Sequence, residues 1–217
     1  MTSPHQFGLR HTFLHLYAGQ SLMRILMNRE LSHETLRGRV ADIGGGHEPD
    51  YFEYFKTDSS ITLERLDGSF SGIDFEKDSL PFQSGAMDTV ILCNVLEHIY
   101  NYRYLLAEVH RILSAEGRLI GVVPFWVGYH PDPHDYFRYT EEALRRILKD
   151  AGFKDVSIKP LGGGPLLANF NTLVLSVPRL LRPVLYLWYA GLNHVFIHLR
   201  PKSARRQPLG FVFTALR

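Results

Sequence analysis

Runs of apolar and polar residues divide the chain into short buried strands and longer amphipathic helices. Compact apolar or alternating runs predict strands over 39–43, 61–66, 89–93, 118–123, 156–159 and 211–215. Apolar residues at helical spacing predict one helix or a pair of helices over 13–27, and single helices over 102–113 and 140–150. Because strands alternate with helices, the pattern predicts an α/β fold with a mostly parallel sheet covered by helices on both faces.

A helical insert is predicted over 165–199, before the last strand. Two apolar faces at helical spacing are separated there by Pro178 and Pro183. These helices either complete the core or form a cap that buries an apolar substrate or rests on a membrane. Neither uncharged stretch, 160–177 or 183–199, is continuous and apolar enough to predict a membrane span of about 20 residues.

Charge is unevenly distributed along the 217 residues, although the net charge is only +2. Residues 156–217 carry eight bases and no acid, so this segment has the charge expected for contact with phosphates or an anionic surface. A single cysteine, Cys93, excludes an internal disulfide and suits a reducing compartment. The N-terminal sequence lacks a secretory signal. We therefore expect a cytoplasmic protein, with peripheral association at the inner membrane face as an open alternative.

The strongest motif is a strand that ends in three glycines, Gly44, Gly45 and Gly46. Glycines at this place let the backbone approach a ligand without a Cβ in the way. Pro49 stands where a dinucleotide fingerprint would need its last glycine, which argues against a nicotinamide cofactor. Asp42 precedes the glycines by two residues and suits a cationic ligand that carries an amino acid.

With these residues the chain resembles the class I S-adenosylmethionine-dependent methyltransferases, and most closely their type 11 small-molecule group. Asp42–Gly46 matches the first motif of that family, and Asp67 follows Gly46 by 21 residues, where the family has an acid for the ribose hydroxyls. Later motifs also agree in order and spacing, so the resemblance covers about 39–160. They are Leu80-Pro81-Phe82, Met87-Asp88-Thr89-Val90, Leu96-Glu97-His98 and Ala151-Gly152-Phe153.

The resemblance implies a single methyltransferase domain over 1–217 with a Rossmann-like, mostly parallel, seven-stranded sheet. Its core would span about 39–160, with the helical insert at 165–199 and the last strand within 209–217. The cofactor would be S-adenosylmethionine, released as S-adenosylhomocysteine. Glu76 is an alternative to Asp74 at the adenine, and Asp67 has a second interpretation as a turn residue. The expected cofactor-binding residues are Asp42, Gly44, Gly45, Gly46, Asp67, Asp74, Phe75, Cys93, Asn94 and His98.

The loop after the expected strand at 118–123 carries the candidate catalytic residues His130, His134 and Asp135. Loops at the carboxyl ends of parallel strands face the ligand, and histidine is the common base near neutral pH. The alternative is that these side chains only fix the loop onto the next helix. No metal site is expected here, because the prolines at 131 and 133 suit metal ligation poorly and methyl transfer needs none.

The predicted reaction is methyl transfer to a small-molecule or lipid- or glycan-linked acceptor, at oxygen. Nucleic acid is disfavoured as the acceptor, because Cys93-Asn94-Val95-Leu96 replaces the Asn/Asp-Pro-Pro-aromatic motif of many enzymes that methylate nucleic-acid amino groups. The alternative function is a non-catalytic Rossmann-like module that binds a membrane surface or a protein partner. The sequence makes no prediction about oligomeric state.

Overall fold

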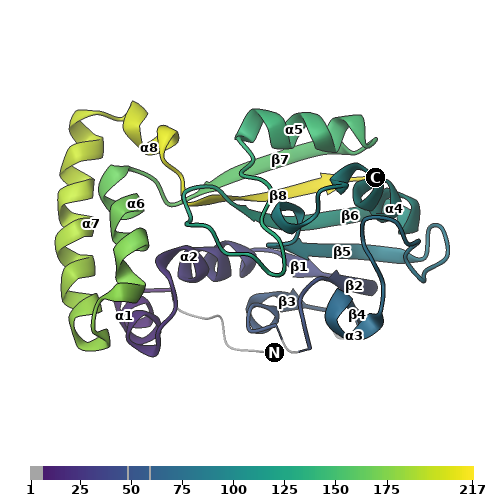
Figure 1. Cartoon of the computed structure of the whole chain (residues 1–217), viewed down its shortest axis with the longest axis horizontal. Helices are drawn as coiled ribbons and strands as arrows, with labels where there is room; N and C mark the ends of the chain where they lie inside the picture. Colours follow the sequence, from purple (N-terminus) through teal and green to yellow (C-terminus); the bar gives the residue numbers. More distant parts are fainter. Residues whose placement is uncertain (1–6, 48, 59) are drawn as a thin grey trace.

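A six-stranded sheet forms the centre of the computed structural model, which describes residues 7–47, 49–58 and 60–217 (Figure 1). The prediction that no secretory signal is present rests partly on residues 1–6, which lie outside the described residues. The strand order is β4-β2-β5-β6-β8-β7. The strands are β2 (Arg39–Ile43), β4 (Thr62–Leu66), β5 (Met87–Cys93), β6 (Leu113–Pro124), β7 (Lys154–Leu161) and β8 (Gly210–Leu216). A separate parallel pair joins β1 (Thr35–Leu36) to β3 (Lys56–Thr57).

The sheet is mostly parallel, as the alternation of strands and helices predicts. β4, β2, β5 and β6 run parallel, whereas β8 pairs antiparallel with both β6 and β7. The described residues give this sheet six strands, one fewer than expected. Residues 72–86 form turns: the Asp74 carboxylate accepts from Glu76 N (2.9 Å), and the Asp78 carboxylate accepts from Asp74 N (2.9 Å). Side chains thus take the N–H groups that a further strand would have to pair.

Helices cover both faces of the sheet, because successive strand residues point to opposite sides. Along β5, Val90 and Leu92 pack in one buried cluster, and Ile91 and Cys93 pack in the other. The first cluster includes residues of α4 (Tyr102–Ile112) and α5 (Glu141–Asp150). The second includes residues of α1 (Leu9–Ala18), α2 (Leu22–Leu31) and α6 (Pro165–Leu173). Both faces are therefore filled with apolar side chains.

Residues at both ends of α5 explain where this helix begins and ends. Thr140 accepts a hydrogen bond from Ala143 N (3.1 Å) at the N-terminus of α5, so it caps the helix as its position predicts. Gly152, with φ of 95°, follows the helix end, where a left-handed residue is favoured. By contrast, Tyr51–Phe55, expected to begin or continue a helix after the glycines, contains only the short 3-10 helix η1 (Phe52–Tyr54).

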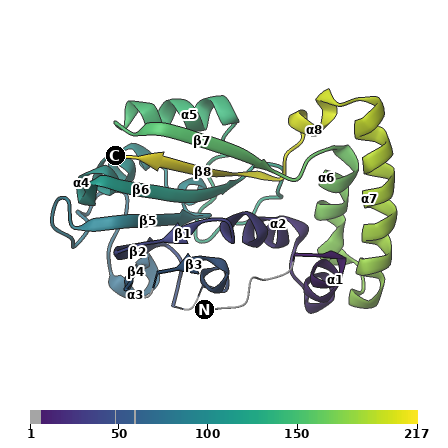
Figure 2. The same ribbon diagram turned by 180° about the vertical axis from the view of Figure 1, so that it is seen from behind.

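The predicted insert is helical and lies at the end of the molecule toward which the parallel strands point (Figures 1 and 2). It consists of α6, the short 3-10 helices η3 (Val174–Ser176) and η4 (Arg179–Leu181), and α7 (Arg182–Leu199). The five-residue helix α8 (Lys202–Arg206) then leads into β8. α7 packs on α6 and α1, and α6 packs on α2. Asn171 of α6 accepts a hydrogen bond from Met23 N (2.9 Å), which ties the insert to α2.

Candidate active site

The glycine turn after β2 brings the main chain close to the end of β5. Gly44 has φ of 78°, and a Cβ at this position would lie 2.6 Å from Val95 Cγ2. Gly44 N also donates to the carbonyl of Leu66 at the end of β4 (2.7 Å). Gly46 has φ of 72° but faces open space. Glycine is required at 44 by both conformation and packing, and the turn leaves room for a ligand beside Gly46.

Asp42 lies beneath this turn and is completely buried. Its Oδ1 accepts a hydrogen bond from the hydroxyl of Tyr51 (2.8 Å), while its Oδ2 has no partner among the described residues. A Cβ on Gly45 would lie 2.6 Å from Asp42 Oδ2, so the carboxylate touches the turn. Burial raises the pKa of Asp42 to about 6, although the Tyr51 hydrogen bond opposes that effect. The turn therefore lies over a negative charge that is only partly compensated.

Asp67, at the end of β4, lies across the turn from Asp42. Its Oδ2 accepts from Gly46 N (3.0 Å), and its Oδ1 accepts from Ser69 N (2.9 Å) at the start of α3 (Gly68–Ser71). Partial burial would raise the pKa of Asp67, but hydrogen bonds from Ser69 and Gly46 outweigh this and lower it. The carboxylate is thus ionised and fixed in direction. Because Ser69 Oγ also donates to Oδ1, the remaining acceptor capacity for a ligand hydroxyl lies on Oδ2.

A cavity of ≈ 1160 Å³ opens along this edge of the sheet. Among the residues lining it are Gly46, Asp67, Asp74, Phe75 and His134. Phe75 is buried, and Asp74 forms an ion pair with Lys77 (2.8 Å). Glu76, the alternative acid for the adenine contact, also lines the cavity. Its carboxylate accepts hydrogen bonds from the backbone N–H groups of Tyr100 and Asn101, just before α4. The Asp74 carboxylate is engaged as well, by Glu76 N and Lys77 Nζ, so the choice between the two acids stays a prediction.

A second cavity, of ≈ 500 Å³, adjoins the first on the side of α2. Met23 and Met27 of α2 line it together with Tyr51, Cys93 and His130. The two cavities share Gly44, Gly45, Asn94, His98 and Asp132 in their linings. They therefore meet above the carboxyl ends of β2 and β5, where open parallel sheets bind their ligands.

Cys93 and Asn94 mark this meeting point from the end of β5. Cys93 is buried, and desolvation raises the pKa of its thiol, so it is a neutral wall of the smaller cavity. Asn94 has φ of 55°, an uncommon conformation for a residue other than glycine. Its N–H is held by the carbonyl of Val122 (2.9 Å), and its side-chain amide contacts Met27 Sδ (3.6 Å).

The loop between β6 and α5 docks on the 3-10 helix η2 (Leu96–His98) that follows β5. Tyr136 N and Phe137 N donate to the carbonyl of Glu97 (2.8 and 3.2 Å), and Tyr139 Oη donates to the carbonyl of Leu96 (3.0 Å). His98 Nδ1 forms a short hydrogen bond with the carbonyl of His134. This loop is therefore held above the junction of the two cavities.

The structure gives different surroundings to the three candidate catalytic residues of this loop, His130, His134 and Asp135. The Asp135 carboxylate, almost fully buried, pairs with both terminal nitrogens of Arg138 and accepts from His130 N (3.0 Å). The hydrogen bond from Arg138 lowers the pKa of Asp135 to about 2. Asp135 thus holds the loop in place. His130 faces the smaller cavity and His134 the larger one, so the two histidines lie on different sides of the junction.

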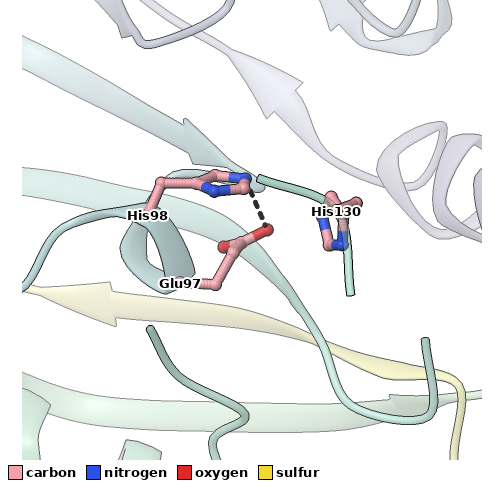
Figure 3. A group of neighbouring side chains, drawn as sticks. All are labelled: Glu97, His98 and His130. Atoms are coloured by element: carbon pink, nitrogen blue, oxygen red, sulfur yellow. Dashed lines mark ion pairs between the residues drawn. The ribbon is translucent and has the colours of Figure 1, made fainter. Parts of the chain in front are cut away.

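Glu97 is a candidate site residue that sequence reasoning named in a motif but did not place in the site. Its side chain is completely buried, and both carboxylate oxygens lack a hydrogen-bond partner among the described residues. Desolvation raises the pKa of Glu97 to about 8. In Figure 3 the polar ends of Glu97, His98 and His130 point toward one another. The sequence offers one signal for this residue: it is an acid among apolar residues, directly after a buried strand.

Comparison with known proteins shows which proteins the chain resembles. A family model described as a methyltransferase domain matches residues 56–121. A probable S-adenosylmethionine-dependent methyltransferase of Mycobacterium tuberculosis is 28% identical over 98 residues, which cover 42% of this chain. The matched part spans only 36% of the length of that relative. An uncharacterised protein of Methanocaldococcus jannaschii is 50% identical over 44 residues, 20% of this chain and 19% of its own length.

Solved structures show the same fold over nearly the whole chain. An S-adenosylmethionine-dependent methyltransferase from Archaeoglobus fulgidus aligns with a TM-score of 0.55 at 16% identity, covering 96% of this chain and 99% of its own. The 1,6-didemethyltoxoflavin-N1-methyltransferase of Burkholderia thailandensis, solved with bound 1,6-didemethyltoxoflavin and S-adenosylhomocysteine, aligns at 0.51 with 18% identity. That alignment covers 100% of this chain and 91% of the other. These likenesses confirm the expected Rossmann-like α/β fold.

Proposed function

We propose that this chain, a class I S-adenosylmethionine-dependent methyltransferase of the type 11 group, transfers a methyl group from S-adenosylmethionine to a hydroxyl of a lipid- or glycan-linked acceptor. The observation that carries the proposal is the junction of the two cavities at Gly44, Asn94 and His98. One cavity has the polar residues suited to a nucleoside, and the other has space for an acceptor. The alternative, a non-catalytic module, is not favoured, because the matched relatives are described as methyltransferases.

The larger cavity would hold the cofactor. Asp67 accepts hydrogen bonds from the ribose hydroxyls, since its carboxylate is ionised and oriented by Gly46 and Ser69. Phe75 and Asp74 lie beside the adenine, and the glycine turn lets the methionine portion approach the backbone. The buried negative charge of Asp42 favours a sulfonium ligand with an ammonium group over a neutral one.

Methyl transfer is an in-line displacement at carbon. The acceptor oxygen forms a bond to the methyl carbon, the carbon–sulfur bond breaks, and the electron pair stays on sulfur as the sulfonium becomes a neutral thioether. The residues of the junction hold the two reactants in line, which supplies much of the rate. The acceptor hydroxyl must also lose its proton, and His130, which lines the acceptor cavity together with His98, is the proposed base.

The acceptor cavity favours a ligand with both apolar and polar parts. Met23, Met27 and Val127 give it an apolar side, while Arg24 and Asp132 give it charged groups. A glycan or lipid headgroup attached to an apolar portion would suit this lining.

The outer surface of the insert supports an acceptor that lies in a membrane. Along α7 the exposed side chains include Val184, Trp188 (67% exposed), Val195 and Leu199 (74% exposed). Arg200, Lys202, Arg205 and Arg206 follow directly, and no acid occurs after Asp155. Apolar area combined with positive charge is what peripheral binding to anionic lipid requires. No helix in the described part of the chain combines the length and apolar character needed to cross a bilayer.

The test of this function is transfer of a labelled methyl group from S-adenosylmethionine to acceptors in organic and aqueous extracts of bacterial envelopes. We expect label in the lipid or glycolipid fraction, and no label when Asp67→Ala replaces the wild type. Asp150→Ala, an exposed change on α5, is the matched control and should retain transfer. Label confined to nucleic acid, or absent from every fraction, would contradict the proposed acceptor class.

A further inference from the structure

Three side chains, Glu97, His98 and His130, bring one carboxylate and two imidazoles together at the junction of the two cavities (Figure 3). One ligand atom from each lies within 4.8 Å of the others. We propose that these three residues form a binding site for a divalent transition-metal ion, on the wall shared by the cofactor and acceptor cavities.

The first argument is the state of the Glu97 carboxylate. Its side chain is 0% exposed, and neither oxygen has a hydrogen-bond partner among the described residues. Buried carboxylates are normally hydrogen-bonded or paired, because an unpartnered one costs several kcal/mol in desolvation. Burial raises the pKa of Glu97 and the charge of Arg138 acts to lower it, but both terminal nitrogens of this arginine donate to Asp135 and not to Glu97. A cation between Glu97 and the histidines would satisfy both oxygens.

The second argument is the orientation of the two imidazoles. His98 Nδ1 is held by the carbonyl of His134, so its Nε2 is the nitrogen free to bind, and that atom lies 3.7 Å from Glu97 Oε1. His130 Nδ1 lies 3.0 Å from the carbonyl of Gly128 and 3.3 Å from Arg138 Nη2, and both contacts leave its Nε2 available. A backbone carbonyl that accepts from the other ring nitrogen is the usual arrangement behind a metal-binding histidine.

The distances suit an ion after small adjustments. Two ligand atoms bound to zinc at about 2.1 Å are roughly 3.4 Å apart in tetrahedral geometry. The 3.7 Å between Glu97 Oε1 and His98 Nε2 is too long for a hydrogen bond but close to that spacing. His130 lies on the loop, and its partly exposed ring can close the remaining gap by a change in side-chain torsion.

One carboxylate and two imidazoles select the class of ion. Imidazole suits zinc, iron, cobalt and nickel, and carboxylate suits them as well, whereas magnesium and calcium prefer oxygen ligands. Three protein ligands also leave at least one coordination position open. His98 lines both cavities and His130 lines the acceptor cavity, so the open position would face the acceptor.

A role for the ion in catalysis rests on the proposed function and would replace His130 as the base, because a metal-bound imidazole does not accept the proton of the acceptor. An acceptor hydroxyl bound at the open position would release its proton to solvent more readily, because the cation stabilises the alkoxide. The alkoxide oxygen then bonds to the methyl carbon while the carbon–sulfur electron pair returns to sulfur. The products are a methyl ether and S-adenosylhomocysteine, and the ion returns unchanged.

The test is direct metal binding to the purified chain. Zinc is titrated by equilibrium dialysis, and cobalt is titrated by its visible absorption, which reports coordination. The variants are Glu97→Gln, which keeps shape and removes charge, and His130→Ala. His33→Ala is the control, since this exposed histidine lies on the connection after α2. The affinity of each sample for S-adenosylhomocysteine is measured alongside.

We expect one tightly bound ion in the wild type and in His33→Ala, and binding weaker by about 100-fold or more in the two site variants. Absence of a tight site, or equal binding by wild type and Glu97→Gln, would overturn the metal site. Circular dichroism establishes that each variant is folded; if His130→Ala is not, Glu97→Gln decides. A wild type that binds S-adenosylhomocysteine but no metal would reject this inference alone, and a wild type that binds no S-adenosylhomocysteine would reject the proposed function.

Discussion

The backbone N–H of Gly46 donates a hydrogen bond to Asp67 Oδ2 at 3.0 Å, which joins the ends of β2 and β4. This contact holds the glycine turn open and directs the carboxylate into the larger cavity. Two residues that are 21 positions apart therefore act as one unit for ligand binding. Asp67 also caps α3 through Ser69 N, as its interpretation as a turn residue expects, so its contact with a ribose stays a prediction.

Asp42→Asn should stabilise the protein without ligand, in a way that depends on pH. The folded-state pKa of Asp42 is raised to about 6 from 3.8. Its protonated form therefore contributes stability that is fully present below 3.8 and is lost as pH rises through 6. Urea unfolding should show little difference near pH 4 and a gain of about 3 kcal/mol for the variant above pH 7. A difference of equal size at both pH values would contradict this origin.

Gly44→Ala should destabilise the fold more than Gly72→Ala. Both glycines have positive φ, 78° and 67°, so both substitutions carry the cost of that conformation. Only at 44 would the new methyl group meet a neighbour, Val95 Cγ2, while nothing lies within 4 Å at 72. Overpacking adds roughly 1–3 kcal/mol. Thermal unfolding of the two variants measures the difference, and equal losses would show that the clash is relieved.

His130→Ala should reduce kcat by about 100-fold or more while the affinity for S-adenosylhomocysteine stays within about threefold. The reason is that His130 lines the acceptor cavity, whereas the cofactor cavity is built from other residues. His134→Ala should have the smaller effect on kcat, because the loop contact to His98 uses its main-chain carbonyl, which alanine retains. Rates and binding are measured on the same samples. The reverse order of effects on kcat would move the chemistry to His134.

The chain should sediment with anionic liposomes and not with neutral ones, and added salt should weaken this binding, because surface attraction is screened over about 8 Å at physiological ionic strength. Trp188→Glu, on the exposed face of α7, should reduce sedimentation. Glu142→Gln, a surface change on α5, is the control. If the chain sediments with neither liposome type, the proposed membrane association is wrong, and the proposed methyltransferase site is not affected.

Much of the fold follows from local patterns along the sequence. The strands at 39–43 and 118–123 were predictable because each is a compact apolar run. The start of α5 was predictable because Thr140 is followed by two acids. The turns at 72–86 were harder to foresee. They depend on Asp74 and Asp78 binding backbone N–H groups, which only a defined local geometry produces.

Some residues of the candidate site could likewise be predicted from the sequence, and others could not. Gly44 and Asp67 were predictable from motif spacing, because they act through the backbone and through one carboxylate. Glu97 was not, because its importance comes from burial without a partner and from His130, 33 positions later, approaching it through the docked loop. Asp135 is likewise defined by its pairing with Arg138, a contact that residue types alone leave open.

The most direct test of the central claim is calorimetric titration of S-adenosylhomocysteine into the wild type, Asp67→Ala and Asp150→Ala. We predict binding of one ligand by the wild type and by Asp150→Ala, whose exposed side chain lies on α5. Asp67→Ala should bind at least about tenfold more weakly, because it loses charge-assisted hydrogen bonds of roughly 1.5–3 kcal/mol each. Wild type that binds no S-adenosylhomocysteine, or Asp67→Ala with unchanged affinity, would contradict the account.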